Sequence, residues 1–265
     1  MPGTRIHFPF EYFPLQTIAS FVVLVTMPVK ATMHTISVII PVFNEADIIA
    51  ATIARLRACD IGKHIAEIIV VDGGSTDGTV ELAGQAGAIV LLSAKGRAKQ
   101  MNVGARAASG NLLYFLHADT LPPIGFPSAI IDAVLAGFSI GCLRLTFDVN
   151  HWFMKANAWF TRFNVNAFRF GDQSLFVQRD IFEKAGGFNE KNIILEDQEI
   201  IPRLQKHGRF VVLRLAVVTS GRKYITNGVF KTQAVYFLVY FLYRLGVPQQ
   251  RLLQLYKRLV KQDKL

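Results

Sequence analysis

LLYFLHADT, the sequence of residues 112–120, contains the clearest structural signal in this chain. Its first five residues are bulky and apolar without polar alternation, which is typical of a strand buried on both faces of a parallel sheet. His117 and Asp119 follow, and the prolines at 122 and 123 prevent continuation as a central strand. Ligands of open α/β sheets bind at the carboxyl ends of strands, so His117 and Asp119 are candidates for handling a metal ion or a phosphate. The structural alternative is that Asp119 caps a loop and His117 is a rim residue.

Three earlier apolar runs are each followed by a helical pattern. The expected strands are residues 36–40, 67–71 and 88–92, and the expected helices are residues 46–57, 80–86 and 100–108. Asn44 is the expected N-cap of the first helix, because its side chain can accept a hydrogen bond from a free backbone N–H. Strands that alternate with helices at this spacing predict right-handed βαβ units, and so an α/β fold with a mostly parallel central sheet flanked by helices.

The composition limits the class of protein. The chain has 265 residues, of which 51% are apolar and 18% charged, and this balance fits a protein that contacts a membrane surface. Its net charge of +10 suits anionic partners such as nucleotide phosphates or acidic lipid head groups. Only two cysteines occur, which argues against a disulfide framework and is compatible with a reducing compartment.

The glycine-rich turn at residues 73–79, GGSTDGT, matches neither G-x-G-x-x-G nor G-x-x-x-x-G-K-[ST]. Dinucleotide oxidoreductases and P-loop enzymes therefore lose support. Asp72 ends the strand before this turn, and its carboxylate can accept hydrogen bonds from a base or from ribose hydroxyls. A divalent cation at Asp119 would then hold a diphosphate, with Lys95 and Arg97 near enough in sequence to neutralise its oxygens.

Three motifs in this order resemble those of the family 2 glycosyltransferases, which have the GT-A fold that binds nucleotide-diphospho-sugars. They are PVFNE at 41–45, VVDGGSTDGT at 70–79, and the strand that ends in HAD at 117–119. The resemblance extends over about residues 36–218. It implies a nucleotide site lined by Pro41, Asn44 and Glu45, a contact of Asp72 with the uracil or ribose, and Asp119 as the last residue of the metal-binding D-x-D.

Two positions depart from the family pattern. His117 stands where the first Asp of D-x-D is usual, and Gly73 replaces the second Asp of the common VVDDGS. The segment LLYFLHADT, with GDQ at 171–173 and GGF at 186–188, more closely resembles a bacterial subgroup of small family 2 enzymes. An imidazole ligand suits Mn²⁺ better than Mg²⁺. The expected cofactor is therefore a divalent metal, Mn²⁺ or Mg²⁺, held by Asp119 and His117.

The resemblance also assigns the acceptor side, to which Asp172, Gln173 and Glu196 would belong. Glu196 and Asp197 match the family's E-D motif at the start of a helix expected to run to residue 207. Asp197 is then the catalytic base, because an acceptor hydroxyl is a poor nucleophile until its proton is removed in the transition state. Asp172 is the competing base. The structural alternative is that the acids only stabilise the helix N-terminus.

Two segments carry apolar side chains beside basic ones. Residues 151–170 are rich in aromatics, which fits either an amphipathic helix packed on the sheet or a rim that enters lipid or stacks on a sugar. Residues 234–243 are too few to span a bilayer, and residues 248–260 form a basic amphipathic helix that suits a membrane surface, a dimer contact or a lid. We divide the chain into an N-terminal extension at 1–32, disordered or a weak membrane anchor, the GT-A domain at 33–222, and C-terminal amphipathic helices at 223–265.

The expected function is metal-dependent transfer of a sugar from a UDP- or GDP-linked donor to a hydroxyl acceptor, for which a lipid-linked alcohol is one candidate. Inversion at the anomeric carbon is implied by the resemblance. The expected location is cytoplasmic, peripheral at the inner face of the cell membrane. Two alternatives are a nucleotidyltransferase, which would normally have a glycine-rich loop where this chain has PVFNE, and a non-catalytic module that binds a nucleotide-sugar or a membrane surface. Nucleic acid is not an expected partner, because the basic residues form no recognisable nucleic-acid motif.

Overall fold

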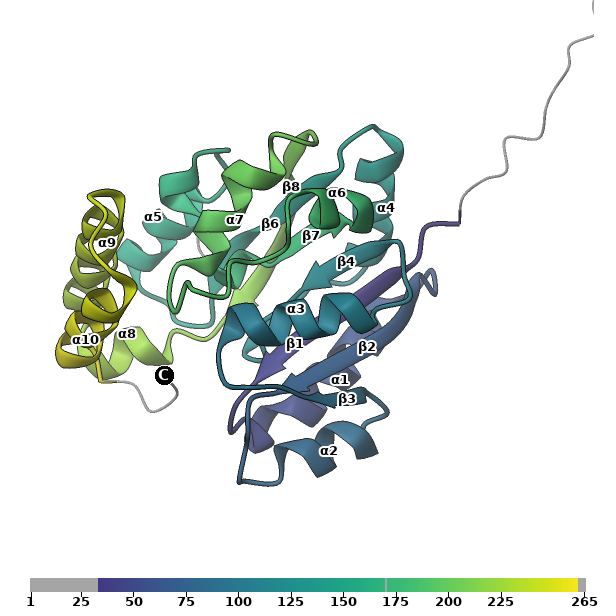
Figure 1. Cartoon of the computed structure of the whole chain (residues 1–265), viewed down its shortest axis with the longest axis horizontal. Helices are drawn as coiled ribbons and strands as arrows, with labels where there is room; N and C mark the ends of the chain where they lie inside the picture. Colours follow the sequence, from purple (N-terminus) through teal and green to yellow (C-terminus); the bar gives the residue numbers. More distant parts are fainter. Residues whose placement is uncertain (1–32, 170, 262–265) are drawn as a thin grey trace, which may run out of the picture. The chain divides into compact units, whose positions relative to one another are not determined.

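The computed structural model describes residues 33–169 and 171–261, and the described residues from His34 onward form one compact unit (Figure 1). The expected N-terminal extension at 1–32 and Phe170 of the aromatic segment lie outside the described residues. Within the described ranges, no helix is both long and apolar enough to cross a membrane.

Eight strands form one sheet, in the order β3-β2-β1-β4-β7-β6-β8-β5. The strands are β1 (Ile36–Val42), β2 (Ile65–Asp72), β3 (Ile89–Leu92), β4 (Leu112–Phe115), β5 (Thr120–Leu121), β6 (Ile140–Phe147), β7 (Leu175–Gln178) and β8 (Phe210–Thr219). β3, β2, β1 and β4 are parallel neighbours, as are β6 and β8, whereas β7 is antiparallel to both β4 and β6 and β5 is antiparallel to β8. The predicted α/β class with a mostly parallel sheet is confirmed.

β4 lies in the middle of this order and is buried on both faces, as its sequence predicted. Leu112 and Tyr114 pack in a core with α1 and α4, while Leu113 and Phe115 pack in a second core with α3, α6 and α7. All four side chains are at most 3% exposed. In Figure 1, α3 accordingly covers one face of the sheet, and α1 and α2 lie on the other.

Ten α-helices and two short 3₁₀ segments are seen in the described part of the chain. The helices are α1 (Ala46–Cys59), α2 (Thr79–Gln85), α3 (Arg97–Ala107), α4 (Phe126–Leu135), α5 (Trp152–Phe160), α6 (Arg179–Lys184), α7 (Glu196–Leu204), α8 (Arg222–Asn227), α9 (Val229–Arg244) and α10 (Gln249–Leu259). Two local expectations were wrong. Asn44 is not the N-cap of α1, because its backbone is left-handed with φ of 53° and Glu45 occupies the cap position. α3 starts three residues earlier than expected, because Gly96, with φ of 138°, turns the chain directly before Arg97.

The C-terminal helices pack on each other and on the segment before α7. Leu252 and Tyr256 of α10 are buried in a cluster with Val235 and Val239 of α9 and with Ile194. The apolar face of α10 is therefore covered within the chain. Of the three alternatives for this helix, the covered face fits a lid better than a surface that binds lipid.

Candidate active site

A cleft of about 780 Å³ opens where β1 and β4 end. Its walls come from the ends of these two strands, the loop before α3, the segment before β7, and the helices α8 and α10. Predicted site residues along it are Pro41, Glu45, Lys95, Arg97, His117, Asp119 and Asp172. The structure thus brings together residues that lie as far as 131 positions apart in the sequence, from Pro41 to Asp172.

Four further cations line the cleft that the sequence analysis did not assign to it. They are Arg222 and Lys223 at the start of α8, Lys257 in α10, and Lys261. With Lys95 and Arg97 they make six cations against three acids, which gives the cleft a surplus of positive charge suited to a diphosphate. The only sequence signal for them was the basic character of the C-terminal segment, which fitted a membrane surface equally well.

Asn44 and Asp72 do not line the cleft. Their side chains instead connect two neighbouring turns. Asp72 is 2% exposed and accepts hydrogen bonds from the backbone N–H groups of Gly74 (2.8 Å) and Ser75 (2.9 Å). The Asn44 N–H donates to Ser75 Oγ at 2.8 Å, and Asn44 Oδ1 accepts from the Thr76 N–H at 2.9 Å. These bonds hold the PVFNE turn against the glycine-rich turn. The contacts of Asn44 and Asp72 with a nucleotide stay predictions.

His117 is the centre of an acidic cluster at the end of β4. Its Nδ1 lies 2.9 Å from Asp172 Oδ1, and its Nε2 lies 3.9 Å from Asp197 Oδ2. His117, Asp119 and Asp172 each offer one possible metal-ligand atom, and these three atoms lie within 4.8 Å of one another. One imidazole nitrogen and two carboxylates make a donor set that fits a divalent cation such as Mn²⁺. The predicted pair of ligands, Asp119 and His117, therefore gains a third candidate in Asp172.

The pKa values of His117 and of its two acidic neighbours are shifted in different directions. Burial raises the pKa of Asp197 to about 6, and the neighbouring charge of Glu196 adds to this shift. Burial opposes the charge on Asp172, but the hydrogen bond and charge of His117 outweigh it and lower the pKa of Asp172 to about 2. The same contact raises the pKa of His117 above its usual value, against the effect of burial. At neutral pH, Asp172 is therefore the firmly ionised acid and Asp197 the more basic one.

A second, narrower chamber of about 140 Å³ adjoins this cluster. Glu196 and Asp197 line it, and its aromatic walls come mainly from α8, α9 and α10. They include Phe147, Tyr224, Tyr236, Phe237, Tyr240 and Tyr256. Arg97, His117, Asp172 and Lys223 line both the chamber and the cleft. The two cavities therefore meet at these four residues.

Gln173 stands apart from both cavities although the sequence placed it on the acceptor side. Its side chain is 2% exposed, and its Nε2 donates to the carbonyl oxygens of Leu143 and Thr161, both at 3.2 Å. These bonds link the segment before β7 to β6 and to the end of α5. The same segment carries Asp172, the neighbour of Gln173 in sequence.

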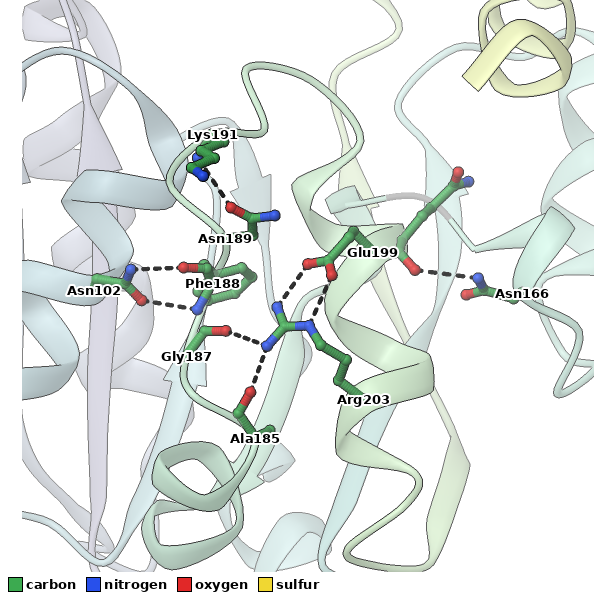
Figure 2. A network of polar contacts seen from close by, with 10 residues as sticks. Asn102, Asn166, Ala185, Gly187, Phe188, Asn189, Lys191, Glu199 and Arg203 are labelled. Atoms are coloured by element: carbon green, nitrogen blue, oxygen red, sulfur yellow. Dashed lines mark hydrogen bonds and ion pairs between the residues drawn. The ribbon is translucent and has the colours of Figure 1, made fainter. Parts of the chain in front are cut away.

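A polar network ties α7, through Glu199 in its first turn and Arg203 in its last, to the segment that contains Gly187 and Phe188 (Figure 2). Asn102 of α3 bonds both the N–H and the carbonyl oxygen of Phe188, each at 2.9 Å. Arg203 of α7 pairs with Glu199 at 2.6 Å and donates to the carbonyl oxygen of Gly187 at 2.7 Å. Gly187 has φ of 67°, and a Cβ on it would lie 2.9 Å from Asn102 Oδ1. The GGF segment therefore requires glycine at this position.

Comparison with known proteins gives a family match over more than half of the chain. The model described as glycosyl transferase family 2 matches residues 37–188. Among curated proteins, an undecaprenyl-phosphate 4-deoxy-4-formamido-L-arabinose transferase from Aeromonas hydrophila is 32% identical over 130 residues, which are 45% of this chain and 40% of that protein. Glycosyltransferase AglE from Haloferax volcanii is 34% identical over 99 residues, 35% of this chain and 33% of that protein. The matched region spans less than half the length of both relatives.

Solved structures share the arrangement of strands and helices. Mannosyltransferase PcManGT from Pyrobaculum calidifontis, in complex with GDP-Man and Mn²⁺, has a TM-score of 0.61 at 19% identity, over 78% of this chain and 62% of that chain. Glucosyl-3-phosphoglycerate synthase from Mycobacterium tuberculosis, in complex with Mn²⁺, UDP and glucosyl-3-phosphoglycerate, has a TM-score of 0.56 at 19% identity, over 81% of each chain. At this identity the similarity establishes the fold alone.

Proposed function

This chain belongs to glycosyl transferase family 2 and has the GT-A fold, and we propose that it transfers a sugar from a nucleoside-diphosphate donor to a hydroxyl acceptor. The observation that carries this proposal is the meeting of a cationic cleft and an aromatic chamber at Arg97, His117, Asp172 and Lys223. A donor diphosphate suits the cleft, and an acceptor suits the chamber. The sugar would then sit between them, at the point where its anomeric carbon is to be attacked.

The donor in this proposal is a UDP- or GDP-linked sugar. Six cations in the cleft supply the charge that a diphosphate needs, and Arg97 can donate to two of its oxygens at once. Pro41 and Glu45 line the same cleft on the side of β1, which supports their assignment to the nucleotide. The solved structures of the same fold that contain GDP-Man or UDP are consistent with either base.

His117, Asp119 and Asp172 are the residues that would hold a divalent cation, Mn²⁺ or Mg²⁺. A bound cation would offset the negative charge that develops on the leaving diphosphate. Arg97 and Lys223 lie at the same junction and supply fixed positive charge there. The two carboxylates of this set, Asp119 and Asp172, both line the cleft.

Asp197 is the proposed base, and Asp172 is the weaker candidate. A pKa of about 6 leaves Asp197 mostly ionised at neutral pH and still basic enough to take a hydroxyl proton in the transition state. A pKa of about 2 makes Asp172 a poor base, and its Oδ1 is occupied by His117 Nδ1 at 2.9 Å. Asp197 lines the chamber and does not line the cleft, so it would act on a hydroxyl held in the chamber. A base that is separate from the diphosphate site is consistent with a single displacement with inversion, which the family resemblance also implies.

The acceptor hydroxyl would enter the aromatic chamber, with Glu196 and Asp172 beside it. In this proposal the GT-A domain at 33–222 carries the metal site and most of the donor site. The helices α8, α9 and α10 close the chamber, and α8 and α10 add cations to the cleft. We propose a lipid-linked acceptor. The name of the Aeromonas hydrophila relative points to a lipid acceptor as well, although the lipid that it names is a phosphate and not an alcohol. The protein would then work in the cytoplasm, bound peripherally at the inner face of the cell membrane.

Turnover of a donor panel tests the proposal. UDP- and GDP-linked sugars are incubated with the protein, Mn²⁺ and a panel of alcohols, and release of the nucleoside diphosphate is measured. We expect release with at least one donor, and loss of at least about 10²-fold in Asp197→Asn. Asp180→Asn, an exposed acid of α6, is the control that should leave the rate unchanged. Donor binding without release across the whole panel would instead favour a non-catalytic binding module.

A further inference from the structure

A third cavity lies outside the proposed active site, between α5 and the paired strands β6 and β8. It has a volume of about 570 Å³. Four of its lining residues are cations, namely Arg144, Lys155, Arg162 and Arg214. The one acid that lines it, Asp148, is engaged as the acceptor of the Gly221 N–H at 2.6 Å. We call this cavity the basic cleft.

The four cations of the basic cleft have no ion-pair partner among the described residues. Arg144 lies next to a shift in register between β6 and β8, and its Nε is buried without a hydrogen-bond partner among the described residues. A buried donor without a partner costs free energy unless a ligand or water satisfies it. An anion in the basic cleft would satisfy this donor.

Exposed aromatic side chains border the basic cleft at the end of α5. Trp159 lines it and is 45% exposed, and Arg162 stacks on the Trp159 ring at 4.5 Å. Phe160 and Phe163 pack near Trp159, with ring centroids 5.2 Å and 5.1 Å away, and are 40% and 43% exposed. Met154 is the only fully buried residue of α5. α5 thus contacts the sheet at β6 and also leaves aromatic side chains exposed, so both of its expected roles stay open.

Cations beside exposed tryptophan and phenylalanine are the combination that binds the interface of an anionic membrane. The cations attract the phosphate head groups, and the aromatic rings occupy the boundary between head groups and acyl chains. A small free anion would use the cations but leaves the aromatic rings unexplained. We propose that the basic cleft binds the phosphate head group of an anionic phospholipid, with Trp159, Phe160 and Phe163 inserted beside it.

This site deepens the proposed function, on which it rests for the membrane location, by naming the partner and the surface that contacts it. The basic cleft shares Leu145 and Phe147 with the aromatic chamber, so only one strand separates the lipid head group from the proposed acceptor site. Docking through the basic cleft would therefore bring the chamber close to the bilayer. A lipid-linked acceptor could reach Asp197 without leaving the membrane surface.

Tryptophan fluorescence gives a direct test, because the two tryptophans of the chain, Trp152 and Trp159, both belong to α5. The variant Trp152→Phe leaves Trp159 as the one indole. Vesicles of phosphatidylcholine with phosphatidylglycerol should shift its emission to shorter wavelengths, whereas phosphatidylcholine alone should not. Inorganic phosphate is added in a separate titration, to detect a site that binds a free anion instead of a lipid. An equal response to inorganic phosphate, or no response to the anionic vesicles, would overturn the proposal.

Vesicle sedimentation with charge variants locates the site. Arg144→Gln combined with Arg214→Gln should weaken partition to the anionic vesicles by on the order of tenfold. Lys191→Gln combined with Lys206→Gln removes the same charge from exposed positions elsewhere and should weaken it much less. Equal losses in both pairs would overturn the site, because they would show attraction by net charge alone. Arg214→Gln alone, at an exposed position, serves if the double variant fails to fold.

These experiments distinguish a failure of the head-group site from a failure of the proposed sugar transfer. UDP binding is measured on the same preparations, and the basic-cleft variants should retain it, because Arg144 and Arg214 do not line the donor cleft. Vesicle binding without any nucleotide binding would remove the proposed transfer and leave the head-group site in place. Nucleotide binding without vesicle binding would remove the head-group site alone.

Discussion

Arg97 Nε lies 2.8 Å from the Glu196 carboxylate, and this ion pair joins the first turn of α3 to the first turn of α7. The Glu196 side chain is 1% exposed, whereas that of Arg97 is 35% exposed and lines both the cleft and the chamber. The charge of Glu196 raises the pKa of Arg97. Glu196 therefore holds a permanent cation at the junction where the proposed donor and acceptor meet.

Replacing Arg97 by methionine should both destabilise the protein and weaken donor binding. The substitution leaves Glu196 buried without its partner, which should cost on the order of 2 kcal/mol, less than for a fully buried pair because Arg97 is partly exposed. Urea unfolding measures this loss. Adding Glu196→Gln removes the stranded charge and should restore most of the stability but not UDP affinity. Recovery of both would show that Arg97 acts only through the fold.

Asp197→Asn should abolish transfer and raise stability at neutral pH. Burial lifts the pKa of Asp197 to about 6, from about 4 in an unfolded chain, so the folded protein loses stability as pH rises through this interval. The neutral amide escapes this loss, and its advantage should be on the order of 2 kcal/mol above pH 7 and absent below pH 4. Thermal unfolding of both proteins with a chelator present, over this pH range, measures the difference. A stability difference that does not depend on pH would contradict the raised pKa.

Gly187→Ala should misplace α7. The alanine would adopt a φ of 67° and put its Cβ 2.9 Å from Asn102 Oδ1, which breaks the bonds between Asn102 and Phe188. We expect a loss of about 1–3 kcal/mol in the free energy of unfolding, together with slower transfer. The control is Gly84→Ala in α2, where a Cβ meets nothing and alanine favours the helix. If Gly187→Ala unfolds like Gly84→Ala, the network in Figure 2 does not support α7 as described.

Tyr240→Ala should separate acceptor binding from donor binding. Tyr240 lines the aromatic chamber but not the cleft, so its loss should raise the KM for the acceptor and leave donor hydrolysis by water unchanged. Phe241→Ala, next in sequence and 59% exposed, is the matched control. An equal effect of both substitutions would show that the chamber does not receive the acceptor.

The sequence predicted the fold and the strand-end residues well because these features are local. The unbroken apolar run at 112–116 can be satisfied only by burial on both faces, and the polar residues after it mark the edge of the sheet. Motif order then identified the family, which the family match over residues 37–188 confirmed. Helix boundaries were less certain, as Gly96 and Asn44 adopt positive φ values that the sequence alone did not reveal.

Contacts made by the C-terminal helices could not be predicted in the same way. Lys223 and Lys257 reach the cleft only because α8 and α10 fold back beside it, and their basic sequence is equally suited to a membrane surface. The contact between His117 and Asp172 depends on the antiparallel pairing of β7 with β4. No local pattern encodes that pairing, so Asp172 was assigned to the acceptor side and its place among the metal-binding candidates was missed.

Calorimetric titration of UDP and GDP into the protein, with Mn²⁺ and again with a chelator, tests the central claim most directly. We expect one nucleoside diphosphate to bind with a stoichiometry of about one per chain, and its affinity to fall by at least about tenfold without the metal or in Asp119→Asn. Asp132→Asn, in α4 and outside all three cavities, should bind like the unsubstituted protein. Absence of heat with every nucleoside diphosphate, or metal-independent binding that Asp119→Asn does not alter, would contradict the proposed site.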